Sequence, residues 1–90
     1  MHDDAIDALF DLIPEIRYVA FGHGQLTTLR ERAALRGGLR FLVVGYGNFH
    51  QLVIPLAAGH VSIAFELDSD PLDHLPAVTE VLAARELVAT

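Results

Sequence analysis

The stretch that decides the fold is Gly38–Leu67, GLRFLVVGYGNFHQLVIPLAAGHVSIAFEL. It contains three apolar runs, Leu39–Tyr46, Phe49–Leu56 and His60–Leu67, separated only by Gly-Asn and by Ala-Ala-Gly. Connections this short allow antiparallel hairpins, whereas a parallel crossover takes about a dozen residues or more. The stretch therefore predicts three consecutive antiparallel strands.

The side chains of these strands predict which faces are buried. The last run alternates between apolar and polar residues, and Ile63 and Phe65 lie on its apolar side. We expect both in the core, because alternation marks a strand with one buried face. The first two runs are apolar on both faces, so we expect cover on both sides of the sheet.

Further elements flank the three strands. Apolar spacing and turn residues predict a helix over Asp3–Ile13, a strand over Ile16–Phe21, a short returning strand over Leu26–Thr28, and a helix over Leu29–Arg36. Gly37 and Gly38 end that helix in left-handed conformation. Asp70 caps a final helix, whose regular part we expect to begin near Leu75 because Pro76 disturbs its first turn.

Together these elements predict one domain over residues 1–90, of the α/β class and the α+β type. The order is helix, strand, strand, short helix, strand, strand, strand, helix. We expect a five-stranded antiparallel sheet with helices on both faces.

Composition narrows the function classes. The formal charge is −6, which argues against nucleic acid as a partner. No apolar run approaches the ~18–20 residues that span a bilayer, and the acidic start lacks the basic region of a signal peptide. We therefore expect a cytoplasmic protein with no membrane partner. Cysteine is absent, which removes thiolate nucleophiles and thiolate metal ligands.

Catalytic chemistry is not indicated either. The five histidines are dispersed, and no pair has the spacing of a zinc motif. His60, Ser62 and Glu66 share one face of a strand, but their side chains project in parallel instead of converging. We expect no enzyme activity, no catalytic residue, no cofactor and no metal.

Basic residues cluster at Arg30, Arg32, Arg36 and Arg40. This cluster suits pairing with acidic groups, either of the chain's own Asp-rich first helix or of a partner. A solvated basic face is the alternative.

The order of elements and several short sequence segments resemble those of the roadblock / dynein light chain family. The matching segments are Pro14–Ala20, Gly22–Gly24, Phe41–Val44, Gly47–Val53 and His60–Phe65. The chain departs from the family in its middle helix, which has only Leu29–Arg36 where family members have several more turns.

The resemblance implies a non-enzymatic scaffold that forms a homodimer through the middle helix and the neighbouring edge strand Leu39–Tyr46. Bacterial members often regulate small Ras-like GTPases, so the resemblance implies such a GTPase as a further partner. The expected dimer or partner interface consists of Leu29, Arg32, Leu35, Arg36, Arg40, Phe41, Val43 and Val44.

A different class of function stays open. A small-molecule-binding sensor of the profilin- or PAS-like class would hold its ligand in a pocket between sheet and helix. Spare core volume distinguishes a sensor from a scaffold, because only the sensor needs an internal pocket. The large aliphatic residues of this chain favour the scaffold.

Overall fold

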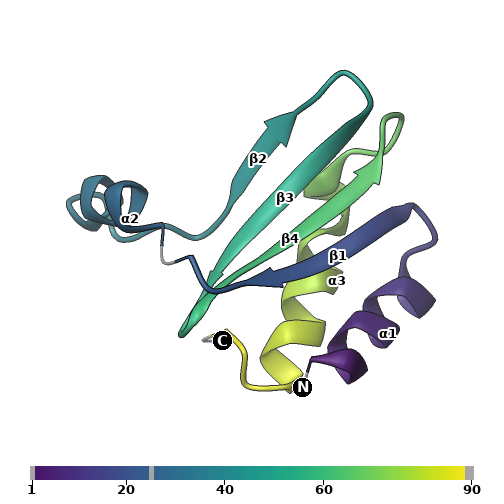
Figure 1. Cartoon of the computed structure of the whole chain (residues 1–90), viewed down its shortest axis with the longest axis horizontal. Helices are drawn as coiled ribbons and strands as arrows, with labels where there is room; N and C mark the ends of the chain where they lie inside the picture. The colour runs from purple at the N-terminus through teal and green to yellow at the C-terminus, as the bar shows by residue number, and fades with distance from the viewer. Residues whose placement is uncertain (1, 25, 89–90) are drawn as a thin grey trace.

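The computed structural model describes residues 2–24 and 26–88 and shows an α+β domain (Figure 1). Its elements are α1 (Asp3–Leu12), β1 (Ile16–Gly22), α2 (Thr27–Ala34), β2 (Leu42–Gly45), β3 (Phe49–Leu56), β4 (Gly59–Glu66) and α3 (Pro71–Ala84).

The four strands form one sheet in the order β1-β4-β3-β2, and every neighbouring pair is antiparallel. The predicted antiparallel run of three strands is confirmed, although β2 is shorter than the predicted Leu39–Tyr46. One row of side chains crosses the sheet on the side of α1 and α3, and comprises Val43, Leu52, Ile63 and Val19.

The prediction of five strands is wrong, because Leu26–Thr28 does not pair with β1. Leu26 has left-handed backbone angles, φ 54° and ψ 39°, and forms the N-cap of α2. Thr27 and Thr28 are the first helical residues. Three residues are too few for their alternation to separate a strand from the start of a helix. The described part of the chain therefore has four strands and three helices.

The prediction of helices on both faces is also wrong. α1 and α3 lie side by side on one face of the sheet, whereas α2 lies beyond the β2 side (Figure 1). α2 is only eight residues long and has no buried residue, so it offers little apolar surface to a sheet. The opposite face of the sheet is left without a helix.

The core lies between the sheet and the α1–α3 layer. Phe65 and Ile63 are fully buried, as predicted, and β4 is an inner strand. Leu9 of α1 and Val78 and Leu82 of α3 complete the same cluster.

Local signals at the helix ends are confirmed in part. The Asp70 carboxylate accepts a hydrogen bond from the Leu72 N–H at 3.0 Å, as expected of a cap. Gly37 and Gly38 have φ of 94° and 99°, the left-handed conformation predicted. α3 nevertheless begins at Pro71 and continues through Pro76, so the predicted late start is wrong. Pro71, at the first helical position, needs no N–H group, whereas Pro76 lies inside α3 and removes one intrahelical hydrogen bond. The buried residues of α3 hold the helix against the core and offset this loss.

We expect Phe65→Ala to lower the free energy of unfolding by about 3–5 kcal/mol, because it opens a cavity in the centre of the core. Urea denaturation measures this change. Leu35→Ala is the matched control, since Leu35 is 92% exposed and should change stability by less than about 0.5 kcal/mol. Equal midpoints for Phe65→Ala and the unmodified chain would contradict the assignment of the core.

Candidate interaction surface

The residues expected at an interface lie on one side of the molecule. β2 is an edge strand, and α2 and the segment that joins it to β2 lie beyond that edge (Figure 1). Leu29 and Leu35 are exposed, and so are Arg32, Arg36 and Arg40. The structure therefore brings the predicted interface residues together along the β2 side. We call β2 with residues 27–41 the β2-side surface.

The two faces of β2 differ in their surroundings. Val43 lies on the helix side, opposite the buried Leu52, but is itself 37% exposed because no helix covers this edge. Val44 lies on the opposite face beside Gln51. Phe41 packs against the core instead of pointing outward. On its outer side β2 therefore pairs with no other described strand, and it carries apolar side chains on both faces.

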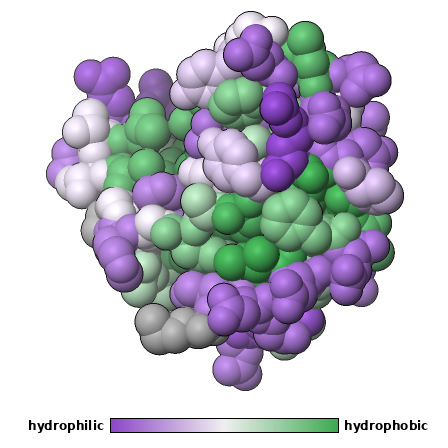
Figure 2. Space-filling view, turned by 45° about the vertical axis from the view of Figure 1, so that its right-hand side comes forward, coloured by the Kyte–Doolittle hydropathy of each residue, from purple (hydrophilic) through white to green (hydrophobic). Residues whose placement is uncertain are grey.

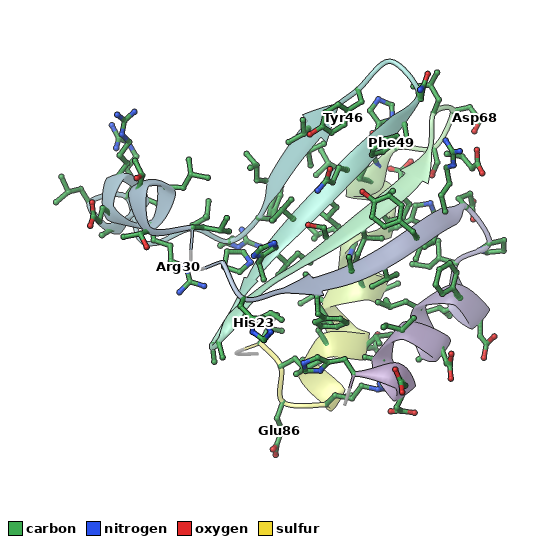
Figure 3. All side chains as sticks on the ribbon, viewed as in Figure 1. His23, Arg30, Tyr46, Phe49, Asp68 and Glu86 are labelled. Carbon is green, nitrogen blue, oxygen red and sulfur yellow. The ribbon has the colours of Figure 1, made fainter. Side chains whose placement is uncertain are left out.

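Arg30 fixes the position of α2. Its Nη2 donates to the carbonyl of Leu56 at 2.7 Å and lies 3.5 Å from that of Gly59, both at the β3–β4 turn. Figure 3 shows Arg30 pointing from α2 toward the sheet. The expected pairing of the basic cluster with the chain's own acidic helix does not occur, because α1 lies at the other edge. Asp4 of α1 pairs instead with Arg85, at 2.6 Å.

An aromatic cluster lies on the face that no helix covers. The ring of Phe49 is 5.0 Å from that of Tyr46 and 6.0 Å from that of Tyr18. Tyr18 comes from β1 and Phe49 from β3, and both lie on the face of β4 that carries the small, fully buried Ala64 (Figure 3). The sequence analysis missed this cluster, because only the strand order brings β1 close to β3.

A cavity of about 930 Å³ opens between the sheet and α3 near the β2 side. Phe41 and Ile54 line the cavity from the sheet side, and Leu75 and Thr79 line it from α3. Arg40 also lines the cavity and contributes polar surface to it. Arg40 contacts the ring of Phe41 at 5.9 Å and has no ion pair with any described residue. The cavity is therefore mainly apolar, and its lining includes one cationic side chain, Arg40, and one carboxylate, Glu86.

The structure also places Ser69 and His74, which are five residues apart, next to Glu15, which is distant in sequence. Ser69 Oγ lies 3.1 Å from His74 Nε2, and Glu15 Oε2 lies 3.8 Å from the same nitrogen. A hydrolytic relay needs the serine and the acid on opposite ring nitrogens, so this arrangement cannot pass a proton from one to the other. Ser69 is buried and His74 stacks on Phe65, which fits a structural contact before α3.

The residues considered for a relay on β4 do not converge either. His60 Nδ1 donates to the carbonyl of Gly24 at 2.8 Å, and Glu66 lies 4.0 Å from Arg17. Within residues 2–24 and 26–88, no three histidine or acidic side chains are grouped as metal ligands would be. None of the helices in these ranges is long and apolar enough to cross a membrane.

Comparisons of the chain with protein-family models, with curated proteins and with solved structures found no match. The argument for function therefore depends on the geometry of this surface.

We expect Arg30→Gln to raise the amide hydrogen exchange of α2 about tenfold, because the charged hydrogen bonds to the β3–β4 turn are lost. Exchange in β3 and β4 should stay slow. Arg32→Gln is the matched control, since Arg32 is exposed on the same helix and makes no side-chain bond to the sheet. Equal α2 exchange in the two variants would show that Arg30 does not hold the helix.

Proposed function

We propose that this chain is a non-enzymatic scaffold or regulatory module that self-associates through the β2-side surface. The observation that carries the proposal is the edge strand β2, with exposed Val43 and an unburied α2 beside it. An open edge with apolar side chains pairs readily with another strand, and proteins normally cover it, charge it or pair it. β2 itself carries no charge.

A second copy related by a two-fold axis supplies the cover that the single chain lacks. Antiparallel pairing of β2 with its copy would join two four-stranded sheets into one. α2 projects past the same edge, so in such a pair it would lie near the sheet of the other copy (Figure 1). Its Leu29 and Leu35, exposed in the single chain, would then find apolar contacts.

The resemblance to the roadblock / dynein light chain family supports the same reading. That resemblance places Leu39–Tyr46 at the sheet edge and uses it for dimerisation, and β2, within this segment, is an edge strand in this structure. We extend the proposal to a small Ras-like GTPase as partner and to a cytoplasmic location. The uncovered face with Tyr18, Tyr46 and Phe49 remains accessible to a partner after β2 pairs.

We expect the purified chain to sediment at twice its 9.8 kDa mass, and Val43→Lys to weaken this association at least about hundredfold. The lysine meets its own copy near the two-fold axis, where like charges repel. Analytical ultracentrifugation measures the effect, and circular dichroism confirms that the variant is folded. Leu12→Lys is the matched control, because Leu12 is an exposed apolar residue on α1, away from β2.

Disulfide trapping gives an independent result, since the chain has no cysteine of its own. Val43→Cys should form a covalent dimer under mild oxidation, whereas Leu12→Cys should form no covalent dimer. A chain that sediments as a monomer at tens of micromolar, with Val43→Lys soluble and unchanged, would show that the edge is protected in another way.

The cavity beside α3 favours a second candidate, the small-molecule sensor. Its volume lies within the range of ligand sites, and Arg40 provides one cationic group beside an apolar wall. A ligand with an apolar body and one carboxylate would match this lining if its carboxylate lies at Arg40 and its apolar end lies toward Glu86 and the aliphatic wall.

Thermal denaturation with decanoate separates the candidates. A sensor should show a melting temperature that rises by several degrees at saturating ligand, and Arg40→Gln should abolish the rise. Arg36→Gln is the matched control, because Arg36 does not line the cavity. The scaffold proposal expects no change in melting temperature.

A further inference from the structure

β1 is the edge strand at the other end of the sheet. Residues Tyr18–Gly22 pair with β4 in unbroken register, after an irregularity at Arg17. On its outer side β1 pairs with no strand of the described residues, because Leu26–Thr28 turn away into α2. In an antiparallel edge strand, the N–H and C=O groups of every second residue point outward and can pair with an added strand.

An apolar strip runs beside this edge on the helix side. Val19 and Phe21 face α1, and Ile6 and Phe10 lie one helical turn apart on α1. Asp4, on the other flank of α1, is tied to Arg85 after α3, so Ile6 and Phe10 are turned toward the outside of β1. Figure 2, which brings this side forward, shows apolar surface with hydrophilic side chains along its border.

An acidic row follows the strip. Asp3, Asp7 and Asp11 recur every four residues along α1, and Asp3 and Asp7 lie next to Ile6 and Phe10, each three residues before one of them. Asp11 continues the row toward the flank that carries Asp4. All three are exposed, and none forms an ion pair with a described residue. The row is about 12 Å long by helical rise, close to the ~17 Å of the five β1 residues. Arg17 does not neutralise it, because its guanidinium is held at the Asn48 carbonyl.

We propose that the β1 edge binds an extended segment of another protein in which arginine or lysine recurs at every second residue. Its backbone pairs with Tyr18–Gly22, and its alternate side chains point toward α1. Their aliphatic stems cover Ile6 and Phe10, and their charged ends reach the acidic row. The site is separate from β2, so a dimer formed through β2 would present one such site at each end of the joined sheet.

The probe is a ten-residue peptide in which arginine alternates with valine, titrated into the full chain. We expect the amide NMR signals of residues 18–22 to shift most, while those of β2 change little. Two further peptides carry N-methyl groups on alternate residues, in the two possible registers. One of them should lose binding at least about tenfold, because a methylated nitrogen cannot donate to the edge.

Charge variants test the acidic row. Asp3→Asn with Asp7→Asn should weaken binding at least about fivefold, because two ion pairs are lost. Glu31→Gln with Glu80→Gln is the matched control, since both residues are exposed, lie on α2 and α3, and change the net charge equally. The control should bind like the unmodified chain.

Three outcomes would overturn the proposal. Equal weakening by both charge pairs would show general attraction to an acidic protein. Binding that neither methylated peptide impairs would show that the edge does not pair. Dissociation of a self-associated chain by the peptide, with shifts at residues 18–22, would identify a second copy as the occupant of β1.

Discussion

Contacts with the β3–β4 turn hold residues 22–30, the segment that determines where α2 lies relative to the sheet. Gly59 has a φ of 119°, and a Cβ at this position would overlap the carbonyl oxygen of Gly22, so only glycine lets the end of β1 approach so closely. His60 binds the carbonyl of Gly24, and Arg30 binds those of Leu56 and Gly59. These contacts fix both ends of residues 22–30. α2 is consequently placed beside β2, and no described strand pairs with the outer side of β1.

Because α2 lies beyond β2, only α1 and α3 are left to cover the sheet (Figure 1). Two helices, α1 and α3, cover one face of a four-stranded sheet, and they meet over the inner strands, where Phe65 and Ile63 are fully buried. Neither reaches over β2, which leaves Val43 exposed and the cavity beside α3 open. Among the described residues, no helix covers the other face, which carries the aromatic cluster around Phe49. Apolar surface and unpaired strand edges therefore lie at the two sides of the sheet and on one face, which is where we propose that partners bind.

Short-range signals in the sequence predicted much of this fold. Loop lengths determined the antiparallel pairing, alternation placed Ile63 and Phe65 in the core, and Asp70 marked a helix start. The errors concern features that depend on contacts between residues distant in sequence. Leu26 became the N-cap of α2 and Thr27 and Thr28 its first residues, because the contacts of Arg30 and His60 hold the surrounding chain, and residues distant in sequence supply those contacts. The interface residues implied by the family resemblance stay a prediction, whereas Tyr18 and Phe49 could not be paired from the sequence because they meet only through the strand order.

The two edges of the sheet differ in chemistry, and this difference separates their partners. The β2 edge is short and apolar and adjoins the arginines around α2, so a second copy can cover it with matching apolar surface. The β1 edge is longer and lies beside the carboxylates of α1, which would repel another copy of the same edge. Self-pairing is thus disfavoured at β1, and a basic strand is favoured there. This difference is the reason for proposing that one sheet binds its own copy at one edge and a different chain at the other.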